Sequence, residues 1–291
     1  MESGSGLERS SLVSPVWLSS HLREPDLAVL DCSWYMPSAG RDADAEYQAA
    51  HIPTALRFDI DIASDPATDL PHMLPSAERF AVLLERMGVR PSDQVVCYDG
   101  SGVNLSAARA WWMFRVFGHR RVAVLDGGFA AWSAATRPVQ RGVVRRESTG
   151  YPVPTADPAL VCTKAQVEAI VAGNSRVQIA DCRPAPRFLG EIDEPRPGLR
   201  RGHIPTSRNV PYTELTDPLT GLMRSPADLR WLLAERGLDA AEPIVALCGS
   251  GTSACALALA IEVIRDSGAR AVGPPVAIYD GSWSEWGRTT P

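Results

Sequence analysis

The stretch Pro243-Ile244-Val245-Ala246-Leu247-Cys248-Gly249-Ser250-Gly251-Thr252-Ser253 decides the fold. It begins with a short apolar run, which is typical of a strand buried on both faces of a parallel sheet. A turn with two glycines follows, and the segment 254–265 is then apolar nearly all round, which predicts a buried helix. Strand, tight loop and helix in this order indicate an α/β domain.

This organisation occurs twice in the 291 residues, at an offset of roughly 150 residues. The matching segments pair Val29-Leu30-Asp31-Cys32 with Ile179-Ala180-Asp181-Cys182, His51-Ile52-Pro53-Thr54 with His203-Ile204-Pro205-Thr206, and Asp126-Gly127 with Asp280-Gly281. Apolar runs at 94–98 and 122–125 predict further strands, and amphipathic patterns at 76–87 and 226–236 predict helices. We therefore expect two tandem α/β domains, each a largely parallel sheet flanked by helices.

The expected boundaries are a first domain at 12–138, a linker at 139–158 that is rich in Arg, Pro and Gly, and a second domain at 159–291. Aligning the halves puts Asp99 opposite Cys248, while Cys97 lies two residues earlier on the expected strand. The first domain is thus expected to be non-catalytic. It would supply one wall of a cleft between the domains, where small ligands often bind.

The composition excludes several classes of function. With 29 basic and 34 acidic residues the net charge is −5, so neither nucleic acid nor a membrane is an expected partner. Residues 1–18 lack a signal-peptide pattern and no apolar run could span a bilayer, so we expect a cytoplasmic protein. The six cysteines are spread singly, without zinc-ligand spacing, and no metal or organic cofactor is implied.

Most free cysteines are small buried hydrophobes, the role expected for Cys32, Cys182 and Cys255. Cys248 differs because it follows a strand and faces a helix N-terminus across two glycines. The amide groups of such a turn converge on one point, where they stabilise a thiolate and make it nucleophilic. Phosphatases and persulfide-forming sulfurtransferases both use this arrangement. In the phosphatase signature Cys-x5-Arg the arginine grips the phosphoryl group, and here that position is Ala254, which disfavours phosphoryl transfer.

Together with motifs elsewhere, the loop resembles the tandem-domain rhodanese superfamily, and within it the 3-mercaptopyruvate sulfurtransferases, whose loop reads Cys-Gly-Ser-Gly-Val-Thr. The resemblance covers nearly the whole chain and includes both His-Ile-Pro elements, Asp69-Leu70-Pro71-His72-Met73-Leu74-Pro75, Trp111-Trp112-Met113-Phe114-Arg115 and Tyr279-Asp280-Gly281-Ser282-Trp283-Ser284-Glu285-Trp286. It implies two rhodanese-like domains. It also implies a sulfurtransferase that moves sulfur from a small anionic donor, 3-mercaptopyruvate, to a thiol, thioredoxin-like or cyanide acceptor through a persulfide on Cys248.

The resemblance further implies that Ser250, Asp61 and His72 assist activation of the thiol. The loop positions expected to contact the donor are Gly249, Gly251, Thr252 and Ser253. Thr252 and Ser253 stand where the family usually has Val and Thr, so the loop keeps a hydroxyl at 253 and becomes more polar.

The segment 183–208 is locally basic, with six arginines against three acidic residues. A guanidinium fork suits the planar carboxylate of a 2-oxo acid, and the resemblance selects Arg187 and Arg196 as the two substrate arginines. An arginine without such context more often belongs to a solvated face or a surface ion pair. That role is expected for Arg183, Arg200, Arg201 and Arg208. The equivalent histidines His51 and His203 are expected to be structural.

Two other functions stay open. Thiosulfate sulfurtransferases resemble the same template but typically carry Arg and Lys after the cysteine, where this chain has Gly249 and Ser250, so thiosulfate is the alternative donor. A binding module could instead hold sulfur or an anion at Cys248 as a sensor without turnover. Trp283 either walls the donor pocket or belongs to the core.

Overall fold

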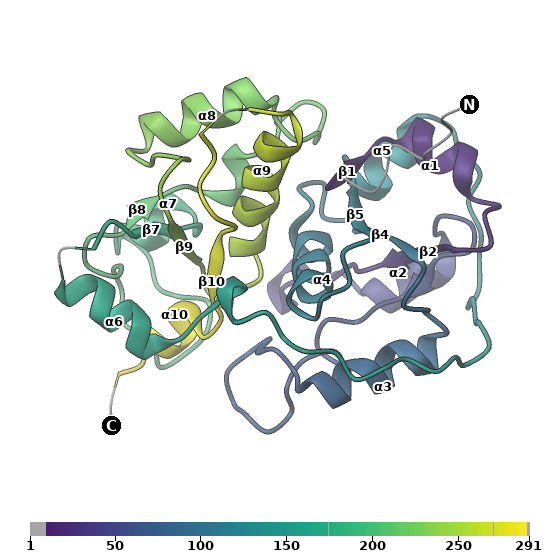
Figure 1. Cartoon of the computed structure of the whole chain (residues 1–291), viewed down its shortest axis with the longest axis horizontal. Coiled ribbons are helices and arrows are strands. Elements are labelled where there is room, and N and C mark those ends of the chain that lie inside the picture. Colours follow the sequence, from purple (N-terminus) through teal and green to yellow (C-terminus); the bar gives the residue numbers. More distant parts are fainter. Residues whose placement is uncertain (1–9, 174, 270, 290–291) are drawn as a thin grey trace. The chain divides into compact units, whose positions relative to one another are not determined.

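The computed structural model describes residues 10–173, 175–269 and 271–289, which form two compact units (Figure 1). Unit 1 contains the chain up to Ala63, Pro75–Ala156 and Leu219–Leu222; unit 2 contains Ser64–Leu74, Asp157–Pro218 and the chain from Met223 onward. Each unit thus includes one short segment from the other half of the sequence. Residues 1–9, 174, 270 and 290–291 lie outside the described residues, so part of the N-terminal segment discussed above and the end of the predicted second domain are not described.

Unit 1 is built on a five-stranded sheet of order β1-β5-β4-β2-β3 in which every pair is parallel. Its strands are β1 (Leu12–Val13), β2 (Leu27–Asp31), β3 (Leu56–Arg57), β4 (Gln94–Tyr98) and β5 (Val122–Leu125). Its helices are α1 (Pro15–His21), α2 (Ala43–Ala49), α3 (Ala77–Met87), α4 (Leu105–Val116) and α5 (Gly128–Ala134).

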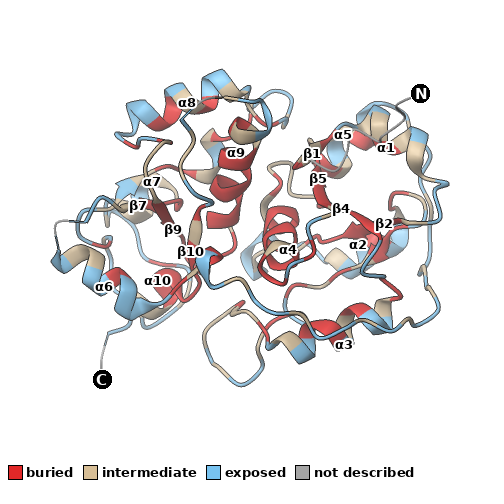
Figure 2. Ribbon diagram, viewed as in Figure 1, coloured by how far each residue is buried: buried red, intermediate tan, exposed pale blue. Residues whose placement is uncertain are grey.

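Helices cover both faces of the unit 1 sheet. Leu18 of α1 and Trp132 of α5 join the apolar side chains of one sheet face in a buried cluster. On the other face, α4 is buried along nearly its whole length, and the ring of Phe114 meets that of Phe80 from α3 edge to face at 5.4 Å (Figure 2). The continuous apolar strands of the sequence are thus explained by burial on two faces.

Unit 2 repeats this topology with the order β6-β10-β9-β7-β8, again all parallel. Its strands are β6 (Val161–Cys162), β7 (Gln178–Asp181), β8 (Arg208–Asn209), β9 (Ile244–Leu247) and β10 (Ala277–Tyr279). Its helices are α6 (Lys164–Ala172), α7 (Ala185–Phe188), α8 (Pro226–Glu235), α9 (Ala254–Asp266) and α10 (Ser282–Trp286). Thr54 and Thr206, which end the two His-Ile-Pro-Thr matches, share a left-handed backbone with φ of 69° and 67°. The predicted duplication and fold class are confirmed.

Two layers of helix also flank the unit 2 sheet. Val167 of α6 and Trp283 of α10 pack on one face with Ile179, Val245 and Leu247. Helix α9 covers the other face and is buried along most of its length (Figure 2). Within the described ranges, no helix combines the length and apolar character needed to cross a membrane.

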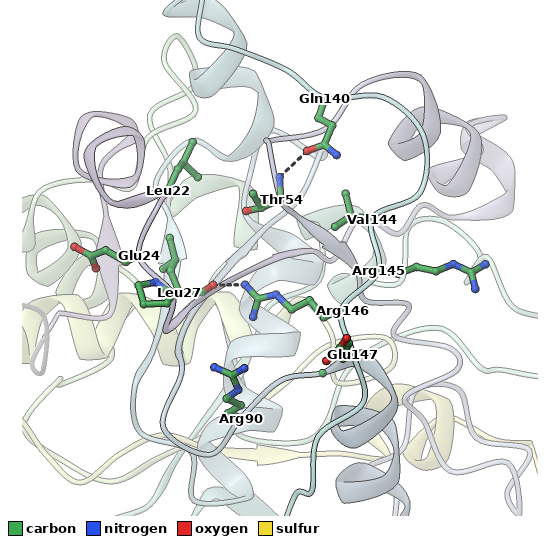
Figure 3. Close-up of a pocket in the computed structure, with 12 residues that line it drawn as sticks. Leu22, Glu24, Leu27, Thr54, Arg90, Gln140, Val144, Arg145, Arg146 and Glu147 are labelled. Carbon is green, nitrogen blue, oxygen red and sulfur yellow. Dashed lines mark hydrogen bonds between the residues drawn. The ribbon is translucent and has the colours of Figure 1, made fainter.

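Most of the predicted linker packs on unit 1 and does not connect the two units as a free segment. Residues 139–156 lie along unit 1. The Val144 amide donates to the Tyr47 hydroxyl at 3.1 Å, and the Ser148 hydroxyl donates to the Glu85 carbonyl at 3.0 Å. A cavity of about 480 Å³ lies under this segment. Figure 3 shows the side chains that line it, including Arg146, which donates to the Leu27 carbonyl. None of the predicted site residues lines this cavity.

Candidate active site

Cys248 occupies the first position of the loop between β9 and α9, and only 2% of its surface is exposed. The start of α10 holds this part of the loop in place. The Cys248 amide donates to Ser282 Oγ at 3.2 Å, and the Trp283 amide donates to the Cys248 carbonyl at 3.0 Å. Ser284 donates to the Gly249 carbonyl from its amide at 2.9 Å and from its hydroxyl at 2.6 Å. The carbonyls of Cys248 and Gly249 therefore both accept hydrogen bonds from α10.

Four backbone amides of the loop are not engaged by the described residues. No hydrogen bond within the described ranges takes up the N–H groups of Gly249, Ser250, Thr252 or Ser253. Ser253, the N-cap of α9, makes no side-chain capping bond, and Gly251 supplies the left-handed turn with φ of 75°. Unpaired amides at a helix N-terminus attract an anion. The loop therefore has the form of an anion cradle with Cys248 at its start.

His72 lies against the same loop. Its Nδ1 is 2.9 Å from Ser250 Oγ and 3.0 Å from Thr252 Oγ1, and the ring is buried. The segment that carries it, Ser64–Leu74, comes from the first half of the sequence but belongs to unit 2. The Leu74 amide fixes this segment by donating to the buried carboxylate of Asp280 at 2.7 Å. The Thr252 hydroxyl thus lies within hydrogen-bond distance of His72, and its contact with the donor stays a prediction.

Asp61, predicted to act with His72, lies in unit 1. Its carboxylate accepts a hydrogen bond from Trp34 Nε1 at 2.8 Å, and its amide donates to Asp59 at 2.8 Å. The exposed carboxylate is thus anchored within unit 1, and its role stays a prediction.

Arg187 and Arg196 both reach Gly249. A Cβ atom added to Gly249 would lie 3.0 Å from Arg187 Nη2 and 3.8 Å from Arg196 Nη1, so the two guanidinium groups converge beside Cys248. A side chain at this position would require the Arg187 guanidinium to shift. Arg196 also lines a cavity of about 360 Å³ together with Ser284 and other residues of unit 2. The two predicted substrate arginines are therefore brought to one edge of the loop.

Glu194 holds Arg187 in this position. Its carboxylate is buried and accepts from Arg187 Nε at 3.2 Å and from Arg187 Nη2 in a very short contact. It also accepts from Arg183 Nη1 at 2.7 Å. One edge of the Arg187 guanidinium is thus committed to Glu194, which leaves the opposite edge for a ligand.

The surface role expected for Arg183 is wrong. Its side chain has no exposed surface and is sandwiched between the carboxylates of Asp181 and Glu194, with its guanidinium carbon 4.2 Å from the centre of the Trp283 ring. Burial opposes its charge, but bonds to these two carboxylates raise the pKa of Arg183. A buried arginine with two acidic partners keeps its charge. The other three arginines assigned to the surface are exposed, namely Arg200, Arg201 and Arg208.

Trp283, His51 and His203 all make contacts within the core or with the backbone. Trp283 belongs to the unit 2 core, where its indole N–H donates to the Arg200 carbonyl at 3.0 Å. His51 and His203 each place Nδ1 against a backbone carbonyl, of Tyr47 at 2.7 Å and of Phe188 at 2.9 Å. These contacts are structural.

Sequence reasoning missed Tyr212, the first residue of a 3-10 turn (Tyr212–Glu214) after β8. Burial raises the pKa of Tyr212, while the charge of Arg187 lowers it and that of Cys248 raises it. The Tyr212 phenol is therefore close enough to Arg187 and Cys248 for their charges to affect its pKa. The only sequence signal for Tyr212 is its position. It lies three residues after Asn209 of β8, at the carboxyl edge of the sheet, where ligands bind in α/β folds.

All six cysteines are free thiols. No group of three or more His, Cys, Asp or Glu side chains in the described part of the chain is arranged to hold a metal ion.

Comparison with known proteins identifies the architecture. The model of the rhodanese-like domain matches residues 14–135 and 163–289. The chain belongs to the rhodanese family. Both rhodanese domains are thus present, one in each half of the sequence.

Among curated rhodanese-family proteins, 3-mercaptopyruvate sulfurtransferase of Rattus norvegicus is 42% identical over 282 residues, covering 95% of this chain and 91% of the relative. Thiosulfate sulfurtransferase of Cricetulus griseus is 40% identical over 288 residues, covering 97% and 93%. The crystal structure of SseA from Escherichia coli, a 3-mercaptopyruvate sulfotransferase, superimposes with a TM-score of 0.83 at 36% identity, covering 95% of this chain and all of that one. Relatives of both donor types thus share nearly the whole rhodanese chain.

Proposed function

We propose that this rhodanese-family chain is a sulfurtransferase that takes sulfur from 3-mercaptopyruvate and passes it to an acceptor through a persulfide on Cys248. The observation that carries the proposal is the loop after β9, where unpaired amides surround Cys248 and two arginines reach Gly249. Relatives named for this activity, at 42% and 39% identity, support the choice of donor.

The arginines would orient the donor. Because Glu194 occupies one edge of Arg187, the donor carboxylate would bind the free edge and share it with Arg196. The sulfur, two carbons away from the carboxyl carbon, would then lie over the loop near Cys248. Fixing the reacting atoms in this way removes much of the entropic barrier to attack.

Sulfur transfer then follows from the position of the thiol. The Cys248 thiolate attacks the donor sulfur, and the carbon–sulfur bond breaks with its electron pair moving into the enolate of pyruvate. The enolate takes up a proton and pyruvate leaves. Hydroxyls of Ser250 and Thr252, both within hydrogen-bond distance of His72, would stabilise the enolate. The persulfide rests against the loop amides.

The acceptor would be a thiol, a thioredoxin-like protein or cyanide, each of which attacks the outer sulfur and restores the thiolate. The proposal places the enzyme in the cytoplasm, where small thiols are abundant.

Thiosulfate is the second candidate donor, favoured by the 40% identity to a thiosulfate sulfurtransferase. Comparing kcat/KM for the two donors with cyanide as acceptor decides between them. We expect 3-mercaptopyruvate to be preferred by tenfold or more, about 1.4 kcal/mol in transition-state binding. A tenfold preference for thiosulfate would overturn the assignment of the donor.

The same assay tests the nucleophile. Cys248→Ser should abolish transfer from either donor, because a hydroxyl cannot hold the sulfane sulfur. Cys97→Ala, which removes a buried thiol of unit 1, is the matched control and should retain transfer. Transfer that survives in Cys248→Ser would refute the mechanism.

A further inference from the structure

A second thiol lies beside Cys248 in the unit 2 sheet. Strands β7 and β9 are parallel neighbours with Asp181 paired to Leu247, and the Cys182 amide donates to the Leu247 carbonyl at 2.8 Å. Cys182 and Cys248 each follow the last paired residue of their strand. Neighbouring strands lie about 4.8 Å apart. This spacing falls inside the range of about 4.4–6.8 Å that a disulfide requires between Cα atoms.

The side chains of the two cysteines also share a sheet face. Ile179, Val245 and Leu247 pack in the cluster on the α6 and α10 side, so the alternation of the strands assigns Cys182 and Cys248 to the opposite face. Helix α9 covers that face, and Cys182 is completely buried beneath it. Burial raises the pKa of Cys182 well above its usual value, and the charge of Cys248 is the next largest cause. The strand register and this electrostatic effect both place the two thiols next to each other.

Cys255, in the first turn of α9, is the other thiol near the loop. Its Sγ donates to the Gly251 carbonyl at 3.2 Å, which commits it to holding the loop. The hydrogen bonds of the described residues give the Cys182 thiol no such acceptor. Cys182 is thus the neighbouring thiol that remains available for chemistry.

We propose that Cys182 is a resolving cysteine, which attacks the inner sulfur of the Cys248 persulfide, releases hydrosulfide and leaves a Cys182–Cys248 disulfide. This adds a hydrosulfide-releasing activity to sulfur transfer, and it rests on the proposed function because that function supplies the persulfide. It also replaces the structural role that the sequence predicts for Cys182.

The step balances without an external oxidant. A bond forms between the Sγ atoms of Cys182 and Cys248, and the bond between Cys248 Sγ and the outer sulfur breaks. The outer sulfur leaves with that electron pair and is reduced to sulfide, the Cys182 sulfur is oxidised, and Cys248 Sγ keeps its oxidation level. Cys182 attacks as its thiolate: the proton that it gives up passes to the outer sulfur, which then departs as HS⁻.

The disulfide would block further turnover until an external dithiol reduced it. Such a dithiol belongs to the same class as the thioredoxin-like acceptor. Cyanide or another acceptor in excess would remove the outer sulfur before Cys182 reacts, so the activity would appear when acceptors are scarce.

A single-turnover experiment tests this inference. The full-length protein, first reduced and freed of reductant, is mixed with 3-mercaptopyruvate without any acceptor. Pyruvate, hydrosulfide and the intact protein mass are then measured. We expect about one hydrosulfide per pyruvate, a protein lighter by about 2 Da, and a cross-linked peptide joining 182 to 248. Cys182→Ala and Cys182→Ser should instead keep an adduct of about 32 Da on Cys248 and release less than about a tenth of the hydrosulfide.

Cys162→Ala is the matched control, because it removes another buried thiol of unit 2 that makes no hydrogen bond to the loop, and its ratio of hydrosulfide to pyruvate should equal that of the unmodified chain. An adduct that persists on Cys248 in the unmodified chain, or one that moves to Cys182, would overturn the inference and leave the proposed function standing. If no pyruvate forms and no adduct appears in any variant, the proposed function itself fails. In both alanine and serine variants at 182, transfer to cyanide should remain, which distinguishes loss of the resolving thiol from misfolding.

Discussion

The loops after β4 and β9 occupy equivalent places in the two sheets, but they begin with different residues, Asp99 in unit 1 and Cys248 in unit 2. In unit 1 the Asp99 carboxylate accepts from the Ser101 amide at 2.8 Å, from the Ser101 hydroxyl at 2.5 Å and from the Ala107 amide in the first turn of α4 at 2.8 Å. In unit 2 Cys248 takes this position, and the amides of Gly249, Ser250, Thr252 and Ser253 make no hydrogen bond within the described residues. One cradle is filled by the chain itself, and the other is open to a ligand. The residue at the first loop position thus decides whether the chain itself supplies a carboxylate to the cradle.

The largest expected effect comes from making the two loops alike. Cys248→Asp would place in unit 2 the carboxylate that fills the loop of unit 1, so the donor would lose both its nucleophile and its anion site. We expect sulfur transfer to fall by more than about a thousandfold while the protein stays folded, with a thermal midpoint no lower than before. Cyanide-coupled assays and thermal unfolding measure the two quantities.

Transfer within tenfold of the unmodified chain would show that the thiol at 248 is dispensable. A collapse of the thermal midpoint would show instead that the two loops do not accept the same anion.

A smaller effect is expected from Arg187, one of the two arginines that reach Gly249 of the open loop. Arg187→Lys keeps the charge but loses the fork that Glu194 orients, so kcat/KM for 3-mercaptopyruvate should fall by about a hundredfold, or about 2.7 kcal/mol. Thiosulfate has no carboxylate, and its kcat/KM should fall several times less. Equal losses for both donors would mean that Arg187 does not recognise the carboxylate.

The smallest effect on activity is expected in unit 1. Asp99→Asn removes the charge that accepts four hydrogen bonds and caps α4, so the free energy of unfolding should fall by about 1–3 kcal/mol. Sulfur transfer at a temperature where the protein is folded should stay within about twofold, since the open loop is in unit 2. Urea unfolding and the donor assay measure these outcomes, and a tenfold loss of turnover would contradict the division of roles.

Much of the fold could be predicted because its signals are local. The apolar runs of β4, β5 and β9 and the helical patterns of α3, α8 and α9 fall where the sequence places them. Strands β1 and β6 have two residues each and occupy sheet edges, so no period could reveal them. Helix α4 is buried all round, which removes the polar face that marks a surface helix.

The site could be predicted in part. The loop at Cys248 carries its own pattern of strand, glycines and helix, whereas the burial of Arg183 depends on carboxylates from two other segments, at 181 and 194. The inclusion of His72 in unit 2 depends on a non-periodic segment that docks through Asp280. Contacts between residues distant in sequence leave no periodic trace, which is why both were missed.

The most direct test of the open cradle is to locate the sulfur. After brief treatment with 3-mercaptopyruvate and immediate acid quenching, peptide mass spectrometry of Cys182→Ala, in which the proposed resolving thiol is absent, should find an adduct of about 32 Da on Cys248. Cyanide added before quenching should discharge it, and Cys97 in unit 1 should carry none. An unmodified Cys248 after pyruvate has formed, or an adduct on another cysteine, would contradict the account.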